Sequence, residues 1–142
     1  MTLTQWAVES GAAVGTQDPD DEAAATALRE QLLAETTSYG SRVHVQVVER
    51  LDQLPFAQYF ANAVIVAGPA SGLSAKELYR VLRPCGGILL APGVKPSESE
   101  SLTKTSGAAE NEIRQSPNGS SIVRGKLPGA LDWDSDRKEL RA

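Results

Sequence analysis

The sequence predicts a domain of the α/β class with a mostly parallel sheet, and three observations support this. Segments with strand and helix patterns alternate between residues 2 and 92 in the order α-β-α-β-loop-β-α-β, which is typical of a sheet with helices on its faces. Residues 61–68 (ANAVIVAG) form an apolar run, as expected for a strand covered on both sides. Residues 18–40 begin with Asp-Pro and end with glycine, the signals of a helix start and stop.

The N-terminal half predicts two helices and two strands. Residues 2–10 have a capping box and an apolar face, and residues 12–17 are a short apolar run of strand length. Asp18 is placed to cap a helix that begins at Pro19 and ends before Gly40. The valine-rich residues 42–48 alternate as in a strand. The inward face of the second helix is expected to carry Ala24, Ala27, Leu28 and Leu32.

The C-terminal half of this region predicts a helix, a sharp turn and a strand. Residues 74–83 are amphipathic, and Ser74 and Glu77 have the spacing of a capping box. Pro84 ends the helix, and the glycines that follow allow the chain to reverse into the apolar residues 87–92.

After Pro92 the composition becomes polar and rich in serine and glycine, which predicts a change in organisation. The sequence therefore divides into an α/β core over residues 1–92, a flexible polar loop over 93–120, a terminal strand within 121–133 and a tail over 134–142.

Composition excludes several functional classes. The 14 basic and 18 acidic residues give a net charge of −4 without a dense basic cluster, so nucleic acid is not an expected partner. The sequence has no apolar segment of membrane-spanning length and no signal-peptide core, so we expect no membrane contact, and a cytoplasmic location if the chain is complete. Cys85 is the only cysteine, which excludes an internal disulfide and a thiolate zinc set. No metal site and no catalytic residue is assigned.

The segment KELYRVLRPCGGILLAPG, residues 76–93, resembles the helix, Pro-Gly turn and fifth strand of Class I S-adenosylmethionine-dependent methyltransferases. AAVGTQDPD (12–20) and FANAVIVAG (60–68) are similar to the second and fourth strands of that family. The resemblance covers residues 3–93 and, more faintly, 121–133. It implies a three-layer Rossmann-like methyltransferase fold.

The resemblance also implies positions for S-adenosylmethionine. Asp18 matches the acid that accepts hydrogen bonds from the ribose hydroxyls, Glu49 and Asp52 match the acidic turn near the adenine, and Gly68 lies at the end of the fourth strand. Other roles explain the same residues. Asp18 also fits the role of a helix N-cap, and we favour that role slightly. Glu49 and Asp52 lie in a loop that we expect to be exposed, and acids in such loops are usually just solvated.

The family's first strand and its glycine-rich turn have no counterpart in this sequence, because they would precede residue 2. We therefore expect a fold that lacks the first strand, and we favour direct pairing of the second and fourth strands, with the order 3-2-4-5 in the family's naming. Two other outcomes are that a partner chain fills the position of the first strand, or that this strand belongs to a longer parent protein. The expected function is that of a degenerate or truncated methyltransferase-like domain, inactive alone, that serves as a structural or interaction module. Its partner would be the remainder of a larger protein or another copy of the chain.

Two alternatives remain. In the first alternative, the chain is part of an active methyltransferase that an upstream segment or a partner completes and that methylates a small molecule or a protein. A flavodoxin-like phosphoacceptor or nucleotide domain fits the alternation but lacks a P-loop. The C-terminal VRGKLPGALDW also resembles, weakly, the end of methyltransferase-like modules that precede quinoprotein-type β-propellers in large bacterial proteins.

Overall fold

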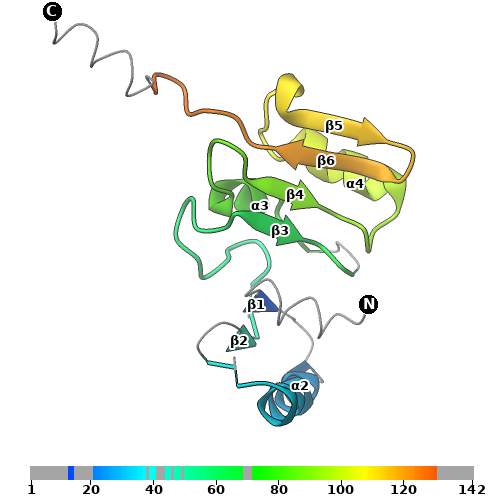
Figure 1. Ribbon diagram of the computed structural model, residues 1–142. Helices are drawn as coiled ribbons and strands as arrows, with labels where there is room; N and C mark the ends of the chain where they lie inside the picture. Colours follow the sequence, from blue (N-terminus) through cyan, green and yellow to red (C-terminus); the bar gives the residue numbers. More distant parts are fainter. Residues whose placement is uncertain are drawn as a thin grey trace, which may run out of the picture. The chain divides into compact units, whose positions relative to one another are not determined.

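The computed structural model gives an α/β fold. It describes residues 13–14, 21–37, 39–40, 44–45, 47–48, 50–68 and 72–130. The chain divides into two compact units, Met1–Pro55 and Phe56–Ala142, whose elements are labelled in Figure 1. Each unit is described by itself. The division at Pro55 differs from the single core over residues 1–92 that the sequence predicts.

The first unit contains a parallel strand pair and a helix. Strand β1 (Ala13–Val14) pairs in parallel with β2 (His44–Val45), and helix α2 spans Asp21–Glu35. Its core consists of Ala25, Leu32 and Val45, with Leu28, Tyr39 and Val47 packed against them. Leu32 and Leu28 thus contribute as predicted, whereas Ala24 and Ala27 are exposed.

The second unit contains a four-stranded mixed sheet. Its strands are β3 (Ala63–Ile65), β4 (Ile88–Leu90), β5 (Ile113–Ser116) and β6 (Gly119–Val123), in the spatial order β3-β4-β6-β5. β3 and β4 are parallel, and β6 is antiparallel to both β4 and β5. Three strands therefore run in one direction and β6 in the other, so the prediction of a mostly parallel sheet is corrected by the central position of β6.

Two of the predicted strand pairs form, in two separate sheets, and the predicted pairing of the second with the fourth strand is not among the described pairs. The pairs β1-β2 and β3-β4 match the expected neighbours 2-3 and 4-5, both parallel. In the described part of the chain they belong to separate sheets of two and four strands. The single sheet with the order 3-2-4-5 is therefore not the arrangement of the described strands.

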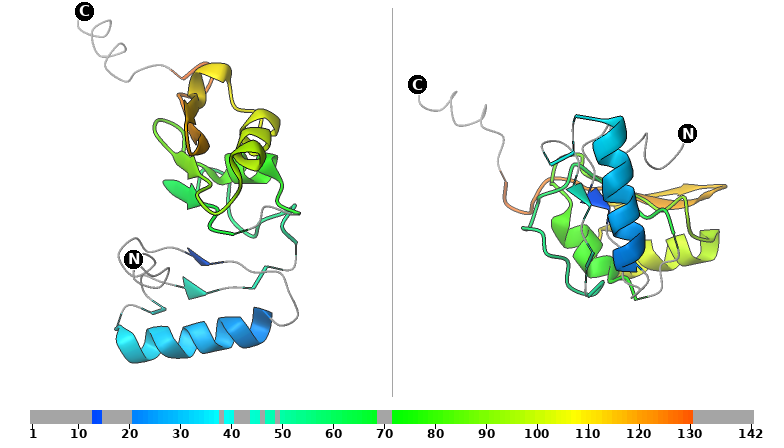
Figure 2. Two further views of the ribbon diagram at one scale, coloured as in Figure 1. Left: turned by 90° about the vertical axis from the view of Figure 1, so that its right-hand side faces the viewer. Right: turned by 90° about the horizontal axis from the view of Figure 1, so that it is seen from below.

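Two helices cover one face of the four-stranded sheet. Helix α3 (Ala75–Val81) connects β3 to β4, and helix α4 (Pro96–Thr105) follows β4. Figure 1 and the left view of Figure 2 show both helices on the same side of the sheet. Leu89 of β4 is buried, while its neighbours Ile88 and Leu90 are 37% and 41% exposed. The described elements of this unit thus form two layers.

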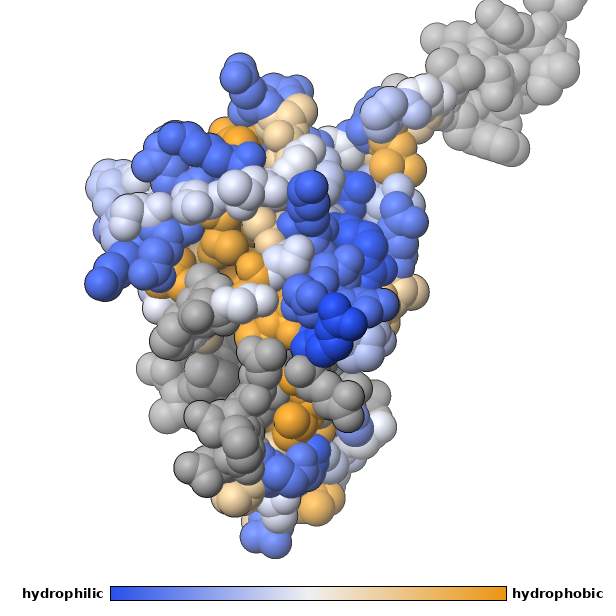
Figure 3. All heavy atoms as spheres, turned by 180° about the vertical axis from the view of Figure 1, so that it is seen from behind, coloured by the Kyte–Doolittle hydropathy of each residue, from blue (hydrophilic) through white to orange (hydrophobic). Residues whose placement is uncertain are grey.

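Residues 93–120, predicted as a flexible polar loop, contain helix α4, the short 3-10 helix η1 (Glu110–Glu112), β5 and the start of β6. The hydroxyl of buried Ser99 donates to the Pro96 carbonyl and accepts from the Ser120 amide. Hydroxyls that are satisfied in this way allow a serine-rich segment to pack. The outer surface on the helix side is mainly hydrophilic, with smaller hydrophobic areas between (Figure 3). The terminal strand predicted within 121–133 is β6, which begins at Gly119 and ends at Val123.

The turn between α3 and β4 requires unusual backbone angles. Cys85 has φ 60° and Gly86 has φ 113°, both in the region where a side chain strains the backbone. The amides of Cys85 and Gly86 donate to the carbonyls of Gly125 and Arg124, each over 2.8 Å. The predicted Pro-Cys-Gly-Gly reversal is confirmed, and Cys85 is an exposed turn residue in it.

Substitution of the two central turn residues should have opposite effects. Cys85→Gly removes the left-handed strain of about 1–2 kcal/mol and should raise the urea midpoint. Gly86→Ala should lower the free energy of unfolding by more than about 1 kcal/mol, because alanine is unfavourable at positive φ. Urea unfolding followed by circular dichroism measures both. A lower midpoint for Cys85→Gly would contradict the assigned turn geometry.

Candidate functional site

The structure describes two of the four residues predicted to bind the cofactor. Asp18 and Glu49 lie outside the described residues. Asp52 belongs to the first unit and Gly68 to the second.

Asp52 forms an exposed ion pair with Arg50. The guanidinium donates to both carboxylate oxygens, over 3.0 and 2.8 Å, and the two side chains are 58% and 64% exposed. The hydrogen bond from Arg50 lowers the pKa of Asp52 below 3.8. Asp52 is therefore a solvated carboxylate with both oxygens bonded to a neighbouring side chain, and such exposed pairs contribute little to stability.

Gly68 follows the carboxyl end of β3, where the chain packs closely on the residues after β4. The Gly93 amide donates to the Val66 carbonyl over 3.1 Å. A Cβ at Gly93 would overlap the carbonyl of Ala67, whereas a Cβ at Gly68 would meet nothing within 4 Å. The two strand ends are therefore held together backbone to backbone, and open space lies beside Gly68.

A buried polar group, which we call the Tyr79–Glu112–Arg124 cluster, lies elsewhere in the second unit. Glu112 is 8% exposed. One of its oxygens accepts from the Tyr79 hydroxyl over 2.8 Å and from the Ala109 amide over 3.0 Å, and the other accepts from the Gly125 amide over 2.6 Å. Glu112 thereby connects α3, η1 and the chain after β6.

Arg124 occupies the C-terminal end of α3. Its Nη1 donates to the carbonyls of Tyr79 and Leu82, each over 2.6 Å. The guanidinium carbon lies 4.2 Å from the ring centre of Tyr79 and 4.7 Å from that of Tyr59. A cation at this end of a helix satisfies the last carbonyls and favours the helix dipole, and the aromatic faces add cation–π attraction.

The contacts of the cluster favour the ionised form of Glu112 and the protonated form of Tyr79. Burial raises the pKa of Glu112, but hydrogen bonds from Gly125, Tyr79 and Ala109 outweigh burial and lower that pKa below 4.5. Burial and the hydrogen bond to Glu112 raise the pKa of Tyr79 above 10.0. An acid–base catalyst works best with a pKa near the operating pH, and both pKa values move away from neutrality.

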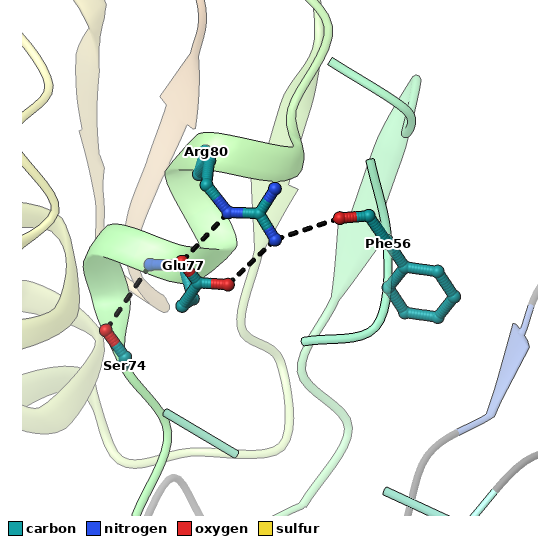
Figure 4. Close-up of polar contacts among 4 residues, drawn as sticks. All are labelled: Phe56, Ser74, Glu77 and Arg80. Carbon is teal, nitrogen blue, oxygen red and sulfur yellow. Dashed lines mark hydrogen bonds and ion pairs between the residues drawn. The ribbon is translucent and has the colours of Figure 1, made fainter. Parts of the chain in front are cut away.

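A second polar contact fastens the segment before β3 to α3 (Figure 4). Arg80 donates to both oxygens of Glu77, each over 2.8 Å, and to the Phe56 carbonyl over 2.9 Å. The Ser74 hydroxyl accepts from the Glu77 amide over 3.4 Å, as its predicted N-cap role requires. Glu77 therefore combines a position in the first helical turn with an ion pair that holds Arg80 in place.

Sequence reasoning did not find the Tyr79–Glu112–Arg124 cluster. Tyr79 and Glu112 are 33 positions apart, and Arg124 is 45 positions from Tyr79. The available signal is a single arginine directly after the apolar end of β6, which is not specific. Tertiary packing brings the three together.

Comparison with known protein families finds no match for this chain, and comparison with curated proteins finds none. No described helix is both long and apolar enough to cross a bilayer. Within the described residues, no three His, Cys, Asp or Glu side chains are grouped so as to hold a metal ion.

The contact between the two strand ends predicts unequal effects of alanine. Gly93→Ala should reduce the free energy of unfolding by about 1–3 kcal/mol, because the new methyl group overlaps the Ala67 backbone. Gly68→Ala is the matched control and should be neutral or stabilise by up to about 1 kcal/mol. Denaturant unfolding of both variants measures the difference. Equal effects would contradict the close packing of the strand ends.

Glu112→Gln should destabilise the second unit by about 1–3 kcal/mol at neutral pH, because an amide cannot accept all three hydrogen bonds. A lowered folded-state pKa means that the carboxylate contributes stability above pH 4.5, which is lost as the pH falls through the folded pKa. The difference in the free energy of unfolding between wild type and variant should therefore become smaller below pH 4.5. Urea unfolding across pH measures it, with the exposed Glu110→Gln as control. A difference that stays constant below pH 4.5 would contradict the assigned hydrogen bonds.

Proposed function

We propose that the chain is a methyltransferase-like α/β domain that acts as a structural or interaction module and not as a catalyst by itself. Its partner in this proposal is the remainder of a larger protein or another copy of the chain. The fold part is supported by residues 76–93, whose resemblance to the family coincides with a helix, a sharp turn and a strand. The strand formed by this segment is parallel to β3.

The mixed sheet is compatible with this class of fold. β3, β4 and β5 share one direction, and β6 opposes them. An antiparallel strand in an otherwise parallel sheet is common among doubly wound domains. The parallel pair β1-β2 adds the same type of strand pairing in the first unit.

The proposed structural role depends mainly on one observation, the hydrogen bonding of Glu112. The two oxygens of this buried carboxylate accept three hydrogen bonds, which join separate segments of the second unit. Its lowered pKa and the raised pKa of Tyr79 leave the pair without a group that exchanges protons near neutral pH. The chemistry of the cluster is that of a structural support.

The alternative, a part of an active methyltransferase, is favoured by one feature. The space beside Gly68 is open, so Gly68 fits a position next to a bound S-adenosylmethionine. Asp52 fits less well, since Arg50 engages both of its carboxylate oxygens. When bound, the cofactor's sulfonium supplies the leaving group for methyl transfer, and the protein's task is to align donor and acceptor.

A ligand titration distinguishes the two functions. The isotopically labelled full chain is titrated with S-adenosylmethionine or S-adenosylhomocysteine, and amide chemical shifts are recorded by NMR. A module without cofactor function should give no saturable shift at micromolar ligand. Saturable shifts at Asp18, Glu49 and Gly68 would overturn the proposal and favour the alternative.

Two variants show whether any shifts report the predicted site. Asp18→Asn should abolish shifts that depend on a carboxylate at the ribose hydroxyls, because the amide is a weaker acceptor without charge. Asp52→Asn is the matched control, since its carboxylate is already paired with Arg50. Shifts that survive Asp18→Asn unchanged would indicate weak binding elsewhere on the surface.

A further inference from the structure

The tip of the β5–β6 hairpin presents an asparagine followed by glycine. Ser116 pairs with Gly119 at the end of the ladder, so Pro117 and Asn118 make the connection between the strands. Asn118 is exposed. Its side-chain amide is thus accessible to water at a reversal of the chain.

The fold requires glycine at position 119. Gly119 has φ 122°, and a Cβ there would lie 2.5 Å from the Ser99 hydroxyl oxygen. That hydroxyl is already engaged, because it donates to the Pro96 carbonyl over 2.8 Å and accepts from the Ser120 amide over 2.9 Å. Ser99 is buried, so a residue larger than glycine after Asn118 would displace a hydroxyl that is held by two hydrogen bonds.

Glycine after asparagine has a chemical consequence. Without a Cβ on the following residue, its backbone nitrogen can approach the side-chain carbonyl of asparagine, and asparagine is among the residues that degrade most readily. We propose that Asn118 is a site of spontaneous deamidation in the folded protein. The glycine that the hairpin needs against Ser99 makes the preceding asparagine reactive.

The reaction needs only water. The Gly119 nitrogen loses its proton and attacks the Asn118 side-chain carbonyl carbon, forming a new C–N bond, and the side-chain nitrogen leaves as ammonia with that proton. Water then opens the cyclic imide at either of its carbonyls. The products are aspartate, or isoaspartate in which the main chain runs through the former side chain. Either product adds a negative charge at the hairpin tip.

The other two asparagines of the sequence, Asn62 and Asn111, serve as internal controls. Asn62 is followed by Ala63 of β3, and its side-chain oxygen accepts from Arg83 over 3.2 Å. Asn111 is followed by the buried Glu112, and its carbonyl accepts from Arg114. A side chain on the following residue hinders the approach of the nitrogen in both cases.

Incubation of the full chain at mildly alkaline pH, followed by peptide mapping with mass spectrometry, tests the proposal. Asn118 should be converted to a mixture of aspartate and isoaspartate several-fold faster than Asn62 and Asn111. The matched variant Asn118→Gln should be converted many-fold more slowly at position 118, since its longer side chain must form a larger ring.

A parallel incubation in urea separates the folded from the unfolded reaction. Conversion of Asn118 in both conditions supports the proposal, because it shows that the hairpin permits the ring closure. Conversion in urea with none in the folded chain would overturn it, as would equal rates at all three asparagines in the folded chain.

Discussion

Arg124 joins parts of the second unit that are far apart in the sequence. Its guanidinium donates to the last carbonyls of α3 and lies over the rings of Tyr59 and Tyr79. Its backbone carbonyl accepts from Gly86, and its amide donates to Gly87, so the same residue also fixes the turn into β4. A buried guanidinium is costly unless its donors are satisfied. The position of α3, the turn and the end of β6 are therefore coupled through one residue, and Glu112 adds hydrogen bonds to Tyr79 and Gly125 at the same junction.

The polar contacts around Arg124 differ in kind from those near Gly68, where the resemblance predicts a cofactor. Glu112 and Tyr79 hold their protons and charges firmly because each stabilises the other's form, the phenol as donor and the carboxylate as acceptor. The strand ends near Gly68 are instead formed by backbone alone, with Gly93 pressed against Ala67. A module that binds through its surface needs a rigid framework of this kind more than it needs a reactive group.

Local signals predicted the turn between α3 and β4 and the strand β4 itself, because Pro84 and the glycines after it act within a few residues. The same reasoning failed for α4, whose buried Ser99 and Thr103 return their hydroxyls to the helix's own carbonyls and so need no apolar pattern. In α2 the alanine-rich sequence offers little contrast between faces, and Ala25 is buried in place of Ala24. The Tyr79–Glu112–Arg124 cluster depends on packing between distant segments, which periodicity does not encode.

The central place of β6 in the sheet affects how the chain emerges during synthesis. β4 is complete at Leu90, but its antiparallel neighbour ends at Val123. Until the ribosome has released that stretch, the backbone groups of β4 on that side have no strand to bond with, and an unpaired strand edge invites association with other chains. The polar helix α4 is translated in this interval. Its many hydroxyl and charged groups favour solvation of the nascent chain before the hairpin arrives.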